Sequence, residues 1–198
     1  MDNDSPEAEW VARVQRGDDR AFEELMGRYK RPVLNFVYRM TGDATEAEDI
    51  ALAVFVRAYR ALTASGFRRR DAEFSTWLFQ IARNAAVDFL RHRSRRPTVP
   101  LLDGDGEAGH AAPGRTAPQE LVALETGAQI AAAVAELPED QRTAIVLAEY
   151  EDRSQAEIAA IMKTSLKSVE ARLYRARQFL RRRLAPLLGA DEDSRQNQ

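Results

Sequence analysis

The chain of 198 residues has no cysteine and only two histidines, His92 and His110. Without thiols it can form neither disulfides nor thiolate metal sites. The two histidines stand apart, one in a run of arginines and the other in a polar segment, so a zinc site is not expected. We therefore expect the chain to bind no metal ion and no cofactor.

Signatures of catalysis and of membrane insertion are also missing. No nucleophile beside a base, pair of carboxylates or phosphate-binding loop is recognisable, so neither an enzyme nor a small-molecule substrate is expected. No apolar run approaches the ~20 residues of a membrane span. The acidic start MDNDSPEAEW lacks the apolar core of a signal peptide. We expect no membrane insertion and a cytoplasmic location.

Charge is nearly balanced over the whole chain but not along it. Charged residues make up 30% of the sequence, yet the net charge is −2. Residues 67–96 include eight arginines and three acidic residues, and residues 141–184 include ten basic and five acidic residues. Each segment therefore has a net charge of +5, which indicates two separate surfaces for polyanions.

Apolar residues recur at helical spacing, and no segment shows sustained strand alternation, so the sequence predicts an all-α fold. We expect two small helical domains, over residues 7–96 and 120–188. Between them, residues 97–119 hold four of the eight prolines and four of the ten glycines, which predicts a flexible linker. The polar residues 189–198 are expected to form a disordered tail.

Turn and capping signals place the helices of the N-terminal domain. Pro32 should open the second helix, because proline is tolerated in a first helical turn. Thr45 and Glu48 match a capping box that would open the third helix. A fourth helix is expected over about residues 75–93.

The C-terminal basic segment predicts two helices and a tight turn within residues 154–184, SQAEIAAIMKTSLKSVEARLYRARQFLRRRL. Ser154 and Glu157 form a capping box for the first helix, and Ser165 is a candidate N-cap for the second. One apolar seam of the second helix should face inward, comprising Val169, Leu173, Ala176, Leu180 and Leu184. A short capped helix, a turn and a basic amphipathic helix are typical of a helix-turn-helix DNA-binding domain.

Motifs in both halves of the sequence resemble those of a known family. The C-terminal block LPEDQRTAIVLAEYEDRSQAEIAAIMKTSLKSVEARLYRARQFL is similar to the C-terminal domain of extracytoplasmic-function (ECF) sigma factors of bacterial RNA polymerase. The first domain matches through RYKRPVLNFVYRMTGDATEAEDI, VFVRAYRAL and FSTWLFQIARNAAVDFLRHRSRR. The resemblance implies an alternative sigma factor that binds core polymerase, recognises the −10 and −35 promoter elements and melts DNA. It also implies control by an anti-sigma protein.

The resemblance further implies three groups of site residues. The −35 element would be contacted by Lys167, Ser168, Glu170, Ala171, Arg172, Tyr174, Arg175 and Arg177. The −10 element would be contacted by Phe67, Arg68, Phe74, Trp77, Arg83, Asn84 and Arg91. Core polymerase would be contacted by Asp49, Leu52, Phe55 and Arg57.

Some of these residues also have a purely structural interpretation. Trp77 shares the apolar seam of its helix and Phe74 lies beside it, so both are candidates for the core as well as for a base pocket. Asn84 could be a solvated helix residue. The chain also departs from the family pattern: Leu52-Ala53 replace a Gln and an acidic residue, and Glu170 stands where a basic residue is common. The promoter sequence therefore does not follow from the resemblance.

Two other functions fit parts of the sequence. The chain could be a helix-turn-helix transcriptional regulator with a helical N-terminal sensor domain. It could also be an interaction module whose C-terminal helix binds a protein or a membrane surface. The basic first domain argues against the regulator, because it looks like a second nucleic-acid surface.

Overall fold

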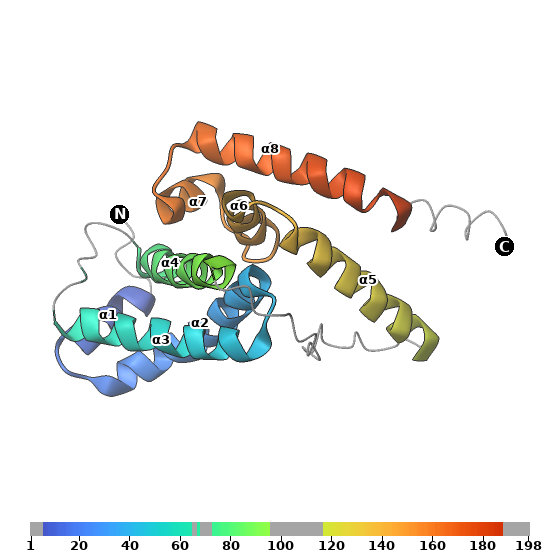
Figure 1. Ribbon diagram of the computed structural model, residues 1–198. Coiled ribbons are helices and arrows are strands. Elements are labelled where there is room, and N and C mark those ends of the chain that lie inside the picture. Colours follow the sequence, from blue (N-terminus) through green and yellow to red (C-terminus); the bar gives the residue numbers. More distant parts are fainter. Residues whose placement is uncertain (1–5, 65–66, 68–72, 96–116, 188–198) are drawn as a thin grey trace.

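The computed structural model describes residues 6–64, 67, 73–95 and 117–187. This part of the chain is helical and contains no strand, which confirms the all-α prediction. Its helices are α1 (Pro6–Gln15), α2 (Asp19–Thr41), α3 (Ala44–Thr63), α4 (Phe74–Arg95), α5 (Ala117–Ala135), α6 (Glu139–Glu149), α7 (Gln155–Met162) and α8 (Leu166–Arg183). In Figure 1, α1 to α4 form one domain and α5 to α8 form a second domain beside it.

The N-terminal domain packs around the buried face of α2. Phe36 in α2 and Phe79 in α4 are both fully buried and meet edge to face, with their ring centroids 5.6 Å apart. Leu25 and Met40 extend the same core along α2, and Leu62 closes it from α3. Long apolar side chains buried on one stripe of each helix give the domain one continuous core.

Two helix boundaries differ from the sequence prediction. Pro32 lies inside α2 and does not open a new helix. Its neighbours Tyr29 and Val33 are both buried, so packing on either side of the proline holds the helix together despite the missing N–H donor. The N-cap of α3 is Asp43, whose Oδ1 accepts a hydrogen bond from the backbone N–H of Glu46 at 3.0 Å. The predicted capping box at Thr45 is therefore wrong by two positions.

Gly42 explains why α2 stops before α3. It has φ of 73°, and its N–H donates to the carbonyl of Tyr38 at 2.8 Å. Glycine is favoured at this position because a side chain would strain a left-handed backbone. The turn sends α3 back along α2.

The C-terminal domain is built around α6. Its central residues Thr143, Ala144, Ile145, Val146 and Leu147 are all buried. The helix α8 packs on one side of α6, and α7 precedes α8 through a short turn (Figure 1). The predicted start of this domain at residue 120 falls inside α5, which begins at Ala117. Most of the predicted linker and the whole predicted tail lie outside the described residues.

The two domains are in contact. Gln80 of α4 donates to the carbonyl of Ala160 in α7 at 3.1 Å, and Arg142 of α6 donates to the carbonyl of Met40 in α2 at 2.7 Å. The guanidinium of Arg39 lies over the ring of Tyr150, 3.6 Å from its centroid. The sequence had predicted two domains and a linker, but not this contact.

Candidate nucleic-acid interface

The helix-turn-helix is formed by α7, a three-residue turn and α8. The Oγ of Ser154 accepts from the N–H of Glu157 at 3.3 Å, and the Glu157 carboxylate accepts from the N–H of Ser154 at 2.9 Å. This reciprocal pair is the predicted capping box. The Oγ of Ser165 accepts from the N–H of Ser168 at 3.2 Å, which confirms Ser165 as the N-cap of α8. Both helix starts are therefore set by local hydrogen bonds.

The turn itself contains a lysine in a left-handed conformation. Lys163 ends α7 with φ of 50° and ψ of 50°, and its side chain is exposed. Only glycine adopts this backbone without strain, so a lysine here carries a conformational cost of about 1 kcal/mol. The arrangement places a positive charge directly before α8.

The buried face of α8 agrees with the predicted seam in its first two-thirds. Val169, Leu173 and Ala176 are buried, while Leu180 and Leu184 are partly buried. On the other faces, Lys167, Glu170 and Arg175 are exposed, and Tyr174 is 67% exposed. Ser168 and Ala171 are partly buried. The N-terminal half of α8 thus presents two cations, one carboxylate and one aromatic ring to the outside.

Arg172 does not belong to this outward group. Its Nη2 donates to Oδ2 of Asp140 in α6 at 2.9 Å, and only 21% of its side chain is exposed. The other terminal nitrogen, Nη1, is buried without a hydrogen-bond partner. The contact of Arg172 with the −35 element therefore stays a prediction, because in this structure a carboxylate distant in sequence holds the guanidinium against α6.

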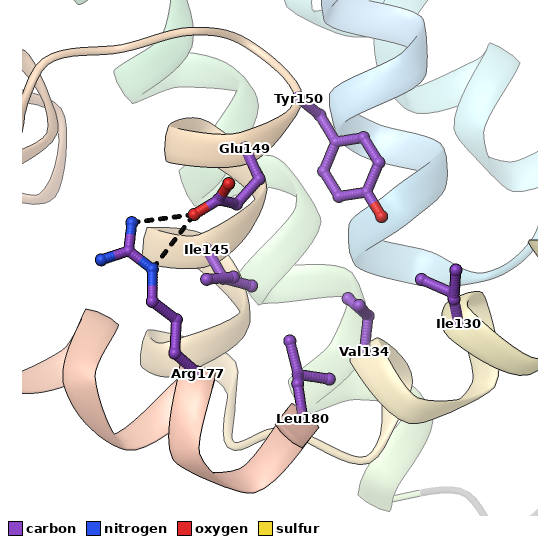
Figure 2. A pocket seen from close by; sticks show the side chains of 7 residues that line it. All are labelled: Ile130, Val134, Ile145, Glu149, Tyr150, Arg177 and Leu180. Carbon is purple, nitrogen blue, oxygen red and sulfur yellow. Dashed lines mark hydrogen bonds and ion pairs between the residues drawn. The ribbon is translucent and has the colours of Figure 1, made fainter. Parts of the chain in front are cut away.

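Arg177 is exposed but engaged by an acidic residue. Its Nε and Nη2 both donate to Oε1 of Glu149, at 3.2 and 2.8 Å. Figure 2 shows this pair beside a groove lined by apolar residues of α5, α6 and α8. The apolar lining residues are Ile130, Val134, Ile145 and Leu180, together with the ring of Tyr150. In this structure Arg177 points toward α6.

The aromatic residues assigned to the −10 element form a cluster. The ring centroid of Phe67 lies 4.7 Å from that of Trp77 and 6.1 Å from that of Phe74, which in turn contacts Tyr29. Phe67 and Phe74 are each only 3% exposed, and Trp77 is partly buried. Neither phenylalanine can stack on a base in this conformation, because each is enclosed by the core. Arg68 lies outside the described residues.

Two of the three polar −10 candidates on α4, Arg83 and Arg91, contact the C-terminal domain. The Nη2 of Arg83 donates to Oδ1 of Asp140 at 3.1 Å, and the Nη2 of Arg91 donates to Oε1 of Glu139 at 2.6 Å. Asn84 is exposed, and its Oδ1 accepts a long 3.4 Å hydrogen bond from Arg83. The two arginines are thus held by the first turn of α6.

Of the residues assigned to contact with core polymerase, one lies in the hydrophobic core and the others lie on the surface of α3. Phe55 is 3% exposed and packs in the core, so it is not available to a partner in this structure. Asp49 and Arg57 are exposed, and Leu52 is 61% exposed. Val56, which the resemblance did not single out, is 41% exposed and lies one helical turn from Leu52. Leu52 and Val56 thus form an exposed i, i+4 apolar pair on the surface of α3.

The loop between α6 and α7 contains a carboxyl group with an unusual pKa. Burial raises the pKa of Glu151 from the ordinary 4.5 to about 7, although Arg153 and Arg39 partly oppose this shift. The folded protein therefore holds this proton more tightly than the unfolded chain does. Stability should consequently fall as pH rises from about 4.5 to about 7.

Replacing Glu151 with glutamine should remove this pH dependence. We expect Glu151→Gln to have a higher Tm than the parent protein at pH 8, and a similar Tm at pH 5, where the carboxyl is protonated. Thermal unfolding followed by circular dichroism at the two pH values measures the effect. The exposed Glu48→Gln on α3 is a control and should show no such pH-dependent gain. An equal gain at both pH values would contradict the assignment.

Within the described residues, no group of acidic and histidine side chains could hold a metal ion, and no helix is long and apolar enough to cross a membrane. The arrangement instead offers a capped basic helix, a second row of arginines on α4 and an apolar pair on α3.

Comparisons with known proteins agree with this layout. Residues 25–96 match the family model for sigma-70 region 2, and residues 127–180 match that for sigma-70 region 4. The chain is 40% identical over 183 residues to the RNA polymerase sigma-H factor of Pseudomonas aeruginosa, covering 90% of this chain and 93% of the relative. It is 38% identical over 183 residues to the ECF RNA polymerase sigma-E factor of Escherichia coli, covering 90% and 94%.

Two solved structures are similar over most of their length. CnrH, in complex with the cytosolic domain of CnrY, aligns with a TM-score of 0.68 at 28% identity, over 94% of this chain and 99% of that one. The sigma factor RpoE of Bartonella quintana, in complex with the anti-sigma factor NepR, aligns with a TM-score of 0.62 at 25% identity, over 83% and 96%.

A chain with region 2 in its first domain and region 4 in its second is a sigma-70-type protein. With these relatives and neighbours, it belongs to the ECF sigma factors. It is an alternative sigma factor, which directs promoter-specific transcription together with RNA polymerase.

Proposed function

We propose that the two domains use separate surfaces to read one promoter. The exposed N-terminal half of α8 enters the major groove of the −35 element, and α4 with the preceding segment meets the −10 element. The apolar pair Leu52 and Val56 on α3 binds core polymerase. The observation that carries this assignment is the exposure of Lys167, Glu170, Tyr174 and Arg175 on a helix whose start is fixed by a cap.

The chemistry of α8 suits direct reading of bases. An arginine can donate two hydrogen bonds to guanine, and a carboxylate can accept from the amino group of cytosine. Arg175 and Glu170 are exposed and can supply these two contacts. The side chain of Tyr174 adds an apolar surface for a thymine methyl group. The exposed Arg181 and Arg182 follow farther along the helix, where phosphate contact is expected.

The function requires no catalytic group of its own. Melting would be driven by the binding of unstacked bases and backbone phosphates, so the protein acts as a DNA-binding subunit and not as an enzyme. Its site of action would be the cytoplasm, with core polymerase and promoter DNA as partners. An anti-sigma protein is a further expected partner, since both neighbours described above are complexes, one of them with a named anti-sigma factor.

Run-off transcription with purified core polymerase tests the proposed function. The protein should permit initiation from a subset of genomic fragments without any other sigma factor. A helix-turn-helix regulator would need a second sigma factor to do so. Failure to initiate on any fragment of the genome would contradict the proposal.

Arg175 and Arg181 should behave differently when each is replaced with alanine. We expect Arg175→Ala to relax base preference at one −35 position, with a loss of about 1–3 kcal/mol of discrimination. Arg181→Ala should weaken binding to all sequences alike, because a phosphate contact carries no sequence information. Binding selections from a randomised −35 library measure both effects. If both variants simply scale affinity across every sequence, the proposed orientation of α8 is wrong.

A further inference from the structure

A shallow hollow of about 290 Å³ lies on the outer face of α2, away from the buried stripe of that helix. It is lined by Met26, Gly27, Lys30, Arg31 and Leu34. Met26 and Leu34 are partly buried, whereas Gly27 and Lys30 are exposed. The hollow therefore has an apolar lining and a basic rim.

A glycine occupies an exposed position in this hollow, inside a helix. Gly27 does not have a positive φ, and a Cβ added to it would meet no atom within 4 Å. Glycine weakens the interior of a helix relative to alanine, and its usual benefit is to let another backbone come close. Nothing in the described part of the chain needs a glycine at this position, so its absent side chain is available to a helix from outside.

Two opposite charges flank this glycine on the same face of α2. Glu23 lies about one turn before Gly27 and Lys30 about one turn after it, and both side chains are exposed. They are about 10.5 Å apart along the helix axis, which is too far for them to pair with each other. Within the residues that the structure describes, neither side chain forms an ion pair or a hydrogen bond.

We propose that this face of α2 binds the same face of a second copy of the chain, with the two helices antiparallel about a twofold axis near Gly27. Glu23 of each copy then faces Lys30 of the other, so the symmetry forms the same ion pair twice. A parallel pair would instead place Glu23 opposite Glu23 and Lys30 opposite Lys30. The charge pattern is therefore complementary to itself in the antiparallel orientation alone.

The hollow fits the side chain that this arrangement brings to it. The methylene groups of Glu23 from one copy lie against Met26 and Leu34 of the other, and the carboxylate reaches Lys30 at the rim. One helix pair buries less than the ~1,000 Å² of a stable interface. We therefore expect a weak dimer, with a Kd of about 10–100 µM that rises with salt.

Sedimentation velocity with the full chain, over a range of concentrations at low salt, tests the dimer. The parent should pass from monomer to dimer, and Glu23→Lys or Lys30→Glu should each raise the Kd about tenfold or more, because like charges then face each other. An equimolar mixture of the two variants should associate again, with a Kd within about threefold of the parent value. The double variant Glu23→Lys with Lys30→Glu should also associate, since the reversed pattern is self-complementary.

A matched pair of variants controls for net charge. Glu48→Lys and Arg60→Glu lie at exposed positions of α3 and change the charge by the same amounts. Each should dimerise like the parent, and mixing them should bring no gain. A parent that stays monomeric throughout would overturn the dimer and leave this face to a different partner. Failure of the mixture and of the double variant to recover association would overturn the antiparallel arrangement.

Gly27→Gln separates association from folding, because it should affect the two in opposite directions. Glutamine favours a helix more than glycine does, so the Tm of dilute protein should rise. Its side chain would hold the two helices apart, so the Kd should rise about tenfold or more. Asn35→Gln, at an exposed position outside the hollow, is the control and should leave the Kd unchanged. An unchanged Kd in Gly27→Gln would overturn the close approach at Gly27. These measurements use neither DNA nor polymerase, so their outcome is independent of the proposed function.

Discussion

Replacing Phe79 with alanine should lower the free energy of unfolding by about 3–5 kcal/mol, the usual effect of removing a buried aromatic side chain. Phe79 is fully buried, meets Phe36 edge to face, and lies beneath the guanidinium of Arg153. Its ring therefore joins α2 to α4 and also contacts the C-terminal domain. The surrounding helices are long and mutually packed, so they are not expected to collapse into the cavity. Urea denaturation followed by circular dichroism measures the change.

The matched control for Phe79→Ala is Asn84→Ala, on an exposed face of the same helix. This control should change the free energy of unfolding by less than about 0.5 kcal/mol. If Phe79→Ala lowers it by no more than the control does, Phe79 does not occupy the centre of the core, and the packing of α4 on α2 described above is wrong.

Placing charges on the exposed apolar pair of α3 should strongly weaken binding to core polymerase. We expect Leu52→Asp with Val56→Asp to lower the affinity by about 30-fold or more, equivalent to about 2 kcal/mol or more. Both side chains point away from the core, so the variant should fold normally. The physical reason is that an apolar contact surface is lost and two carboxylates would have to be desolvated at the interface. Fluorescence anisotropy with labelled protein and purified core polymerase measures the affinity.

Leu124→Asp on α5 provides the control for this surface. Leu124 is 50% exposed and lies in the other domain, so the same chemical change should leave polymerase affinity within about twofold of the parent value. Equal losses in Leu124→Asp and in the α3 variant would show that α3 is not a specific contact surface.

The features predicted correctly from the sequence depend on residues close together in the chain. The capping box at Ser154 and the seam of Val169, Leu173 and Ala176 follow from spacings of three and four residues. The N-cap at Ser165 follows in the same way. Each is set by hydrogen bonds or packing within one or two helical turns, which the sequence pattern records directly.

The features that the sequence did not predict depend on distant partners. Arg172 was expected to face DNA, but Asp140 lies 32 positions earlier in the chain and is its hydrogen-bond partner. Phe67 and Phe74 were candidates for stacking on bases, yet contacts with each other and with Trp77 place them in the core. Neither the Arg172–Asp140 hydrogen bond nor the aromatic cluster follows from a repeat of apolar residues in the sequence, because tertiary packing brings these side chains together. The start of α3 was also predicted wrongly, although it depends on nearby residues: the N-cap is Asp43 and not Thr45.

The position of Asp140 has a consequence for how this protein can evolve. Because one carboxylate accepts from Arg83 and from Arg172, a substitution at either arginine changes the surroundings of the other. The effects of such substitutions should be non-additive, as they are for residues that share a partner. The two arginines are therefore epistatic, and a mutation selected in region 2 alters which mutations are tolerated in region 4.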